Sequence, residues 1–355
     1  MSPRPDERFF AVTHFPVDES RPNEAWPSAG WMMIDDLAAA GWSLERLSDA
    51  FQYAGTLATD AIMIVQGGRE VASWCDITRR FNCHSIRKSF LSALIGYYVE
   101  DGSIDLSLTL DALGIDDVEG LSAVEKQATI YDLLTARSGI YHPAGYETPW
   151  MQSIKPPWHS QPPGTAWCYS NWDFNALGTI FTQLTGRDIH EAFRDVIARP
   201  LGMEDFRHDD ARKDGWMVPD ACSRHPAYAF EMSTRDLARF GLMFLRDGRW
   251  GTRQVIPADW VATSVLPYSH AGTRGAYGYM WWLARSGTGF PGVVQPEGSF
   301  SAQGAGGHFL VVIPPLDLVI VHRVDTVVPG RLVNHFQFGK LLRLILGARH
   351  AVNPR

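Results

Sequence analysis

The spacing of apolar residues changes along the chain, and each kind of spacing predicts a different element. Residues 34–51 repeat apolar side chains at three- and four-residue intervals, which predicts an amphipathic helix. Residues 61–65 form an unbroken apolar run, Gly67-Gly68 is typical of a turn, and residues 70–74 predict a returning strand. We therefore expect a helix followed by a hairpin in the first quarter of the chain.

Helical spacing resumes just after this hairpin. It runs through residues 86–98 and ends at Asp101-Gly102, a pair that suits a helix C-terminus. Two further helices are predicted for residues 174–184 and 234–245, the second with Thr234 as its N-cap.

Strand-like runs return near the C-terminus, before a last amphipathic helix. The runs cover residues 277–283, 309–313 and 318–322, and the helix is expected over residues 332–346. Strands at both ends and helices between them predict an α/β fold, in which residues 1–100 and 231–355 form one domain and residues 101–230 a mostly helical insert. Residues 1–30 are expected to form a surface arm, and residues 142–163 an irregular covering loop.

Composition and charge narrow the choice of partners. The chain has 355 residues and a formal net charge of -7, which gives no reason to expect nucleic acid or an anionic membrane. Its start lacks the apolar stretch of a secretory signal, and no segment is apolar enough to cross a bilayer, so we expect a cytoplasmic protein. The four cysteines form no Cys-x-x-Cys pair and are expected to be buried, reduced thiols. The oligomeric state stays open.

Ser85 and Lys88 form the first pattern with chemical meaning, a Ser-x-x-Lys at the start of a predicted helix. Residues three apart share one face of a helix, so the hydroxyl and the amine can meet. A serine hydroxyl becomes a good nucleophile when a base takes its proton, and lysine can be that base once burial or a neighbouring cation lowers its pKa from about 10.4. The pattern also fits a solvated lysine near a capping serine. Arg87, between the two, is expected to form a salt bridge.

A second pattern, Tyr169-Ser170-Asn171, favours the catalytic interpretation. It follows the turn Pro163-Gly164-Thr165 and precedes a predicted helix. A tyrosine beside a lysine can relay a proton between a nucleophile and a leaving group. The Asn171 amide can hold the lysine or a substrate carbonyl. The alternative is a tyrosine that simply packs at a junction between loop and helix.

These patterns, in this order, resemble the serine β-lactamase-like family, which includes class C β-lactamases, D-alanyl-D-alanine carboxypeptidases, related carboxylesterases and aminohexanoate-dimer hydrolases. Segments 99–106, 129–139, 232–239 and 314–321 are similar to its other recurring blocks, so the resemblance covers nearly the whole chain after residue 55. It implies a β-lactamase/transpeptidase-like fold, with an antiparallel sheet flanked by helices and a mostly helical second domain. It also implies that Ser85 is the nucleophile, Lys88 its base and Tyr169 the proton shuttle.

The third motif departs from that of the family's β-lactamases. Where they carry Lys-Thr-Gly, this chain reads Gly-Ala-Gly-Gly-His over residues 304–308. The resemblance implies that the backbone N–H groups of Ser85 and Ala305 form an oxyanion hole, and that Gly304 and Gly306 lie against the substrate. Loss of the lysine should weaken recognition of a substrate carboxylate.

Several other side chains are candidates for contact with substrate, besides Asn171. His308 either replaces the missing cation, assists deacylation, or is an ordinary strand histidine. Six tryptophans fall in segments expected around the site: Trp150, Trp158, Trp167, Trp172, Trp281 and Trp282. Of these, Trp281 and Trp282 are predicted to touch substrate, and the others to be partly core.

Together the patterns predict a serine hydrolase that cleaves a small ester or amide through an acyl-enzyme on Ser85. A β-lactamase or carboxypeptidase is an alternative, against which the missing lysine and the missing signal count. An acyltransferase and a catalytically silent binding protein are further alternatives. No Gly-x-Ser-x-Gly, His-Glu-x-x-His or nucleotide-binding loop occurs, so neither a metal nor another cofactor is expected.

Overall fold

The computed structural model describes residues 24–285 and 287–349. Most of the arm predicted for residues 1–30 therefore lies outside the described residues. The helices are α1 (Leu44–Gly55), α2 (Arg87–Glu100), α3 (Leu110–Leu113), α4 (Ile130–Leu134), α5 (Pro149–Ile154), α6 (Asn171–Thr185), α7 (Ile189–Phe193), α8 (Thr234–Leu245), α9 (Ala258–Ser264) and α10 (His335–Gly347). Shorter helical turns are η2 (His84–Ile86), η3 (Glu125–Gln127), η4 (Arg194–Ala198), η5 (Gly272–Arg274) and η6 (Pro314–Leu316).

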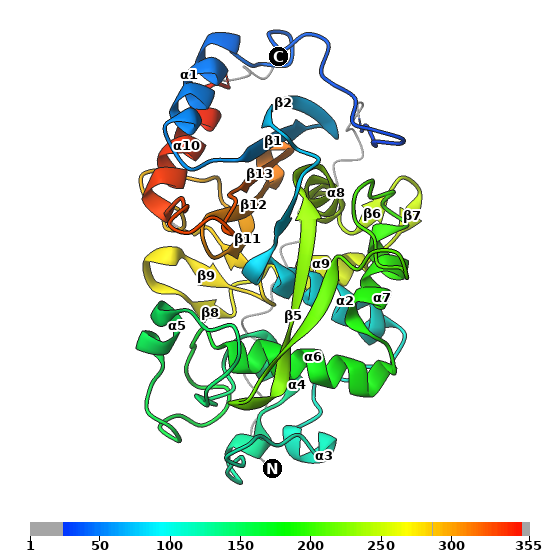
Figure 1. Cartoon of the computed structure of the whole chain (residues 1–355), viewed down its shortest axis with the longest axis vertical. Coiled ribbons are helices and arrows are strands. Elements are labelled where there is room, and N and C mark those ends of the chain that lie inside the picture. Colours follow the sequence, from blue (N-terminus) through cyan, green and yellow to red (C-terminus); the bar gives the residue numbers. More distant parts are fainter. Residues whose placement is uncertain (1–23, 286, 350–355) are drawn as a thin grey trace.

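Eight strands form one antiparallel sheet in the order β2-β1-β13-β12-β11-β10-β9-β8 (Figure 1). They are β1 (Ala61–Gln66), β2 (Arg69–Cys75), β8 (Ser269–His270), β9 (Ala276–Tyr277), β10 (Trp282–Leu283), β11 (Phe300–Gly304), β12 (His308–Ile313) and β13 (Leu318–Arg323). β1 pairs with β13, with Ile62 opposite His322. The α/β class is confirmed, and strands from both ends of the chain share the sheet. The domain boundaries near residues 100 and 231 stay a prediction.

The two faces of this sheet bury different side chains, because successive residues of a strand point to opposite faces. Ile62 and Ile64 of β1 belong to a core cluster with residues of α1 and α10, such as Leu47 and Leu342. Met63 and Val65 belong to the larger cluster, which includes α2 and α8. Figure 1 shows α1 and α10 together on one side of the sheet and α8 on the other. Both faces of β1 are therefore covered, which explains its unbroken apolar run.

A second sheet has most of its residues in the part of the chain that was expected to be mostly helical. It has the order β3-β5-β4, with β3 (Arg80–Asn82), β5 (Ser223–Ser233) and β4 (Gly215–Asp220). The strand β5 packs on α6 and also pairs with β3, directly before Ser85. Sequence analysis missed β4 and β5 because Pro219 and Pro226 interrupt them, and proline argues against a strand. Both prolines fall where the register shifts, between Val218 and Asp220. A further hairpin pairs β6 (Arg249–Trp250) with β7 (Arg253–Gln254).

Several predicted boundaries were wrong, and local backbone geometry explains them. The helix predicted for residues 34–51 begins only at Leu44, because Gly41 has a left-handed φ of 83° and Ser43 is the N-cap. The run over residues 277–283 is two short strands, β9 and β10, joined by a turn in which Met280 has φ 60°.

Other predicted elements differ only at their ends. The N-cap of α8 is Ser233, whose side chain accepts a hydrogen bond from Asp236 N, and Thr234 is the first helical residue. The helix α10 starts at His335, after an Asn334 cap, and not at residue 332. The covering loop over residues 142–163 contains the short helix α5.

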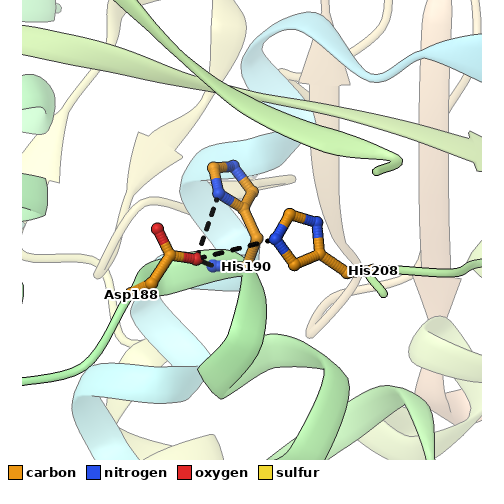
Figure 2. Close-up of side chains that lie close together, drawn as sticks. All are labelled: Asp188, His190 and His208. Atoms are coloured by element: carbon orange, nitrogen blue, oxygen red, sulfur yellow. Dashed lines mark hydrogen bonds and ion pairs between the residues drawn. The ribbon is translucent and has the colours of Figure 1, made fainter. Parts of the chain in front are cut away.

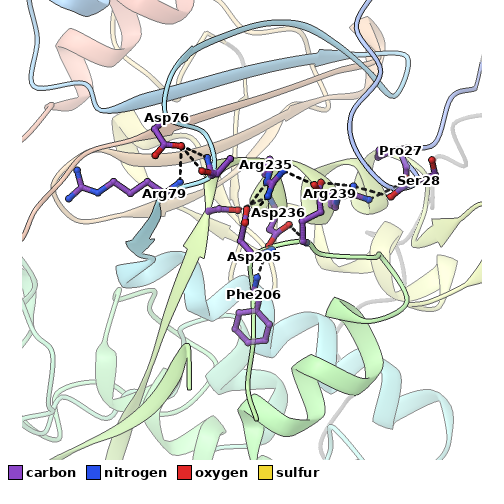
Figure 3. Close-up of polar contacts among 12 residues, drawn as sticks. Pro27, Ser28, Asp76, Arg79, Asp205, Phe206, Arg235, Asp236 and Arg239 are labelled. Atoms are coloured by element: carbon purple, nitrogen blue, oxygen red, sulfur yellow. Dashed lines mark hydrogen bonds and ion pairs between the residues drawn. The ribbon is translucent and has the colours of Figure 1, made fainter. Parts of the chain in front are cut away.

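A buried polar network ties α8 to the segment that precedes β4 (Figure 3). The Asp236 carboxylate accepts hydrogen bonds from the backbone N–H groups of Glu204, Asp205 and Phe206 at 2.7–2.8 Å. Arg239, which is 0% exposed, pairs with Glu204 and also donates to the Pro27 carbonyl. The same network therefore anchors the start of the described chain. No helix within residues 24–285 and 287–349 combines the length and apolar character that a membrane span requires.

Candidate active site

Ser85 lies in the turn η2, between the end of β3 and the start of α2. The residue before it, His84, has a left-handed φ of 46°, which bends the chain sharply and is costly for a side chain other than glycine. The bend is held by hydrogen bonds: His84 N donates to Asn82 Oδ1 at 2.8 Å, and Ile86 N donates to Cys83 O at 3.0 Å. The structure therefore places Ser85 on a fixed turn at a helix start.

Lys88 reaches both other members of the predicted catalytic group. Its Nζ donates to Ser85 Oγ at 2.7 Å and to Tyr169 Oη at 3.0 Å. Ser85 and Lys88 meet because η2 runs directly into α2, and Tyr169 arrives from the segment before α6. The amine is 2% exposed and also lies 4.8 Å from the ring centre of Phe174. The three residues predicted from the two motifs are thus brought together in a buried cluster.

Burial moves the pKa values of this cluster in the directions that keep its members neutral. The pKa of Lys88 is lowered well below its ordinary value, first by burial and second by the positive charge of Arg87. Burial raises the pKa of Tyr169 to about 12, although the hydrogen bond with Ser85 opposes this. A neutral amine can accept the serine proton, and a neutral phenol can pass a proton on.

Arg87 does not form the salt bridge that the sequence suggested. Its Nη2 donates to Asn175 Oδ1 at 2.8 Å, and its guanidinium lies 4.2 Å from the ring centre of Tyr228. Within the described part of the chain no carboxylate pairs with it. A buried cation without a counter-ion repels a second positive charge beside it, so Arg87 helps to keep Lys88 unprotonated.

Asn171 holds a neighbouring loop rather than Lys88. Its Nδ2 donates to the carbonyls of Gly145 and Tyr146, at 3.1 and 2.6 Å. Asn175, one turn later on α6, donates to the same Gly145 carbonyl. Asn171 Oδ1 is buried and has no partner among the described residues.

The end of β11 lies against the turn that carries Ser85, and a glycine makes this contact possible. A Cβ at Gly304 would stand 2.7 Å from Cys83 O and 3.3 Å from His84 Cβ. Ala305 follows in an exposed turn, and Gly306 has a left-handed φ of 86°. Neither Ser85 N–H nor Ala305 N–H has an acceptor among the described residues. Two unpaired donors on adjoining segments fit an oxyanion hole.

Comparison with known proteins gives the family. The profile of the Beta-lactamase family matches residues 44–333, most of the chain. The chain belongs to the Beta-lactamase family. Members of this family with the same fold are serine hydrolases.

Individual proteins resemble the chain at low sequence identity. The unguisins hydrolase ungD' of Aspergillus campestris is 29% identical over 154 residues, 38% of this chain and 29% of that protein. The Bacillus anthracis structure named "Putative 6-aminohexanoate-dimer hydrolase" has a TM-score of 0.62 at 20% identity, over 92% of this chain and 88% of its own. A penicillin-binding protein homologue of Caulobacter crescentus has a TM-score of 0.64 at 14% identity, over 89% and 98%. The structural matches confirm the predicted β-lactamase/transpeptidase-like fold.

His308 cannot replace the lysine that β-lactamases of the family carry in their third motif. It is 0% exposed, and its Nδ1 accepts a hydrogen bond from Arg323 Nε at 3.0 Å. Its pKa lies well below the ordinary value, first because of burial and then because of the Arg323 charge. A ring nitrogen that accepts from arginine is unprotonated, so His308 supplies no cation. The structure thus leaves it as a buried strand histidine.

The two tryptophans predicted to touch substrate have different environments. Trp281 is 0% exposed and packs among Phe240, Phe244 and Phe300. It is therefore a core residue, and the prediction that it touches substrate is wrong. Trp282, although 3% exposed, lies 5.1 Å from Tyr169 between ring centres. It therefore lies beside Tyr169 at the candidate site.

Sequence analysis missed two arginines that the fold brings to this region. Arg323, 0% exposed on β13, donates to the carbonyls of Phe81 and Asn82 and so holds the segment before Ser85. Arg274, in η5, lies over Trp282 with 5.2 Å between Cζ and ring centre. Neither stands in a motif, and each is far from Ser85 in sequence, so only the fold reveals them.

The cysteines beside the motifs are unreactive by environment. Cys83 and Cys168 are buried, and burial raises the pKa of both thiols, to about 12 for Cys168. A thiol with a raised pKa is a poor nucleophile. Cys75 differs from the prediction because it is exposed.

One group of described residues has donor atoms close enough to hold a metal ion: Asp188, His190 and His208 (Figure 2). Asp188 Oδ1 lies 3.4 Å from His190 Nδ1 and 3.9 Å from His208 Nε2. The same oxygen accepts hydrogen bonds from the backbone N–H groups of His190 and Glu191 in α7, and His190 Nε2 lies 3.0 Å from Ala229 O. These bonds account for the arrangement as a helix cap, and the group contributes nothing to the cluster around Ser85.

Proposed function

We propose that this chain hydrolyses a small ester or amide through an acyl-enzyme on Ser85. One observation carries the proposal: a buried Lys88 amine lies 2.7 Å from Ser85 Oγ and 3.0 Å from Tyr169 Oη. A lysine whose pKa is lowered by burial is a base suited to neutral pH. A binding protein on the same scaffold would have no need to bury a base against a serine.

In the first half of the reaction, Ser85 Oγ attacks the carbonyl carbon while Lys88 Nζ takes its proton. The N–H groups of Ser85 and Ala305 hold the oxygen that becomes negative. Tyr169 Oη then gives its proton to the leaving alcohol or amine and takes one from Lys88. The bond to the leaving group breaks, and Ser85 is left acylated.

In the second half, water attacks the acyl carbon. The same pair works in reverse: Tyr169 and Lys88 take a proton from the water and return one to Ser85 Oγ as its bond to carbon breaks. An acyltransferase would differ only in using another acceptor in place of water.

Two considerations favour an ester or amide over a β-lactam. The third motif lacks lysine, and His308 supplies no cation in its place. Two proteins that the chain resembles are named as hydrolases of unguisins and of the 6-aminohexanoate dimer. A β-lactamase or D-alanyl-D-alanine carboxypeptidase is the second candidate, which the family match favours. The proposed partner is a small molecule, in the cytoplasm, and not nucleic acid or a membrane.

The test is turnover of short-chain p-nitrophenyl esters, a p-nitroanilide and nitrocefin by the wild type, Ser85→Ala and Lys88→Met. We expect ester or anilide turnover to fall at least 1,000-fold in both variants. The matched control is Ser103→Ala, which removes an exposed hydroxyl. Circular dichroism checks that the variants fold. Ester hydrolysis that survives in folded Ser85→Ala would refute the assignment, and turnover of nitrocefin alone would favour the second candidate.

A further inference from the structure

Arg274 is a cation held between two aromatic rings at the edge of the site. It ends η5, between β8 and β9. Its Cζ lies 4.3 Å from the ring centre of Trp150 on α5 and 5.2 Å from that of Trp282 on β10. Trp150 is 37% exposed and Trp282 is 3% exposed, so one ring borders solvent and the other the interior.

The guanidinium has no acceptor of its own. Among the described residues it forms no ion pair and donates no side-chain hydrogen bond, in contrast to Arg235, Arg239 and Arg246, which all pair with carboxylates. Its nitrogens are not sealed from solvent, unlike Arg87 Nη1. They are therefore reachable by a ligand.

This cation lies beside the proposed catalytic cluster. The rings of Trp282 and Trp150 lie 5.1 and 6.0 Å from that of Tyr169. Burial, and then the charge of Arg274, lower the pKa of His335 to about 4. His335 Nε2 lies 3.0 Å from Gln303 Oε1, one residue before Gly304. Arg274 thus lies close to Tyr169, because the two tryptophan rings next to it are also neighbours of the Tyr169 ring.

The stacking leaves the hydrogen-bonding edge of the guanidinium available. A guanidinium over an aromatic ring can keep the N–H donors in its plane free, and those of Arg274 donate to no acceptor among the described residues. That edge matches the two oxygens of a carboxylate, which it can bind through two parallel hydrogen bonds. Partial burial strengthens such a pair, because less water competes for it.

We propose that Arg274 binds a carboxylate of the substrate, so that the preferred substrates are esters or amides that carry a negative charge. This inference rests on the proposed function of Ser85. The charge is supplied from η5 and not from the third motif, so the missing lysine leaves anion recognition possible. Trp150 and Trp282 fix the guanidinium and line the path of the chain that links the carboxylate to the reacting carbonyl.

The test compares matched pairs of esters that differ in one charge. Mono-4-nitrophenyl glutarate and 4-nitrophenyl pentanoate differ on the acyl side; 4-acetoxybenzoate and 4-tolyl acetate differ on the leaving-group side. In the wild type, kcat/KM is expected to favour the charged member of at least one pair. In Arg274→Gln, this ratio of charged to neutral should fall roughly 10- to 100-fold, mainly through KM. Arg274→Lys keeps the charge but loses the fork, and should lie between.

Arg343→Gln, which removes an exposed arginine on α10, is the control for loss of net charge and should keep the wild-type ratio. If Arg274→Gln lowers both members of a pair equally, Arg274 only supports the tryptophans and the inference is wrong. If all four esters turn over through Ser85 with an unchanged ratio, the inference alone fails. If no ester or amide turns over through Ser85, the proposed function fails first.

Discussion

Arg87 and Lys88 are neighbours in sequence, and the positive charge of Arg87 helps to keep the Lys88 amine neutral. A guanidinium scarcely loses its proton, so of these two neighbours it is Lys88 whose pKa is lowered. Its counterpart Tyr169 keeps its proton, with a pKa near 12, throughout the usual assay range. The acid limb of the rate profile should therefore report protonation of Lys88.

Replacing Arg87 by Gln is expected to move that acid limb to higher pH. Removing a positive charge makes protonated Lys88 less unfavourable, so its pKa rises and more of the base is lost at low pH. We expect the loss of kcat/KM to be roughly ten times greater at pH 6 than at pH 9. The control is Ser103→Ala, which removes an exposed hydroxyl and should keep the wild-type profile. An unshifted limb in folded Arg87→Gln would show that burial alone sets the pKa of Lys88.

The residue scale also shows what a sequence can and cannot predict about a site. Ser85 and Lys88 were predicted because residues three apart share one face of a helix. Tyr169 was predicted because it belongs to a local pattern, Tyr-x-Asn, that can be recognised without the fold. Arg274 was missed because its position depends on how η5 folds over α5 and β10. Trp281 and Trp282 are adjacent in sequence, yet only one borders the site: Trp282 is the first residue of β10, whereas Trp281, just before the strand, packs among core phenylalanines.

At the scale of elements, helix caps and prolines determined which helices and strands were predicted correctly from the sequence. The helix α6 was predicted within three residues because Gly186 ends it in a left-handed conformation. The first predicted helix was wrong over residues 34–43, where Gly41 and the Ser43 cap outweigh apolar spacing. The strands β4 and β5 were missed because their prolines stand at a shift in register that no spacing rule contains.

The start of α8 offers a prediction at this scale. Asp236→Asn replaces one oxygen of a 0% exposed carboxylate by a donor, which leaves backbone N–H groups of residues 204–206 unpaired. We expect the free energy of unfolding to fall by about 2–4 kcal/mol, as measured by urea denaturation. Asp259→Asn, at an exposed position in α9, should change it by less than about 0.5 kcal/mol. Similar values for the two variants would show that the network does not stabilise the fold.

At the scale of the whole molecule, buried histidines link stability to pH. His322 lies in the sheet, between Thr59 and the Gly307 carbonyl, and burial lowers its pKa to about 4. An unfolded histidine titrates near 6.5, so between pH 6.5 and 4 the unfolded chain binds a proton that the native protein does not. Stability from this group is present above pH 6.5 and is lost as the pH falls to 4.

His322→Gln should remove one proton from this linkage. Urea unfolding at pH 7, 6 and 5 is expected to show a pH dependence smaller than that of the wild type by about 1.4 kcal/mol per pH unit near pH 5. The comparison is His270→Gln, which changes an exposed histidine of β8. Parallel stability curves for wild type and His322→Gln would contradict the assignment.

The pairing of β1 with β13 has a consequence for the newly made chain. Ala61 pairs with Arg323, so about 260 residues separate the partners. At 5–20 residues per second, a ribosome needs roughly 13–50 s to deliver the second strand after the first. During that time the backbone edge of β1 that pairs with β13 has no partner, and an unpaired strand edge is prone to aggregation. Ser85 emerges early, whereas Ala305, its proposed partner in the oxyanion hole, follows about 220 residues later.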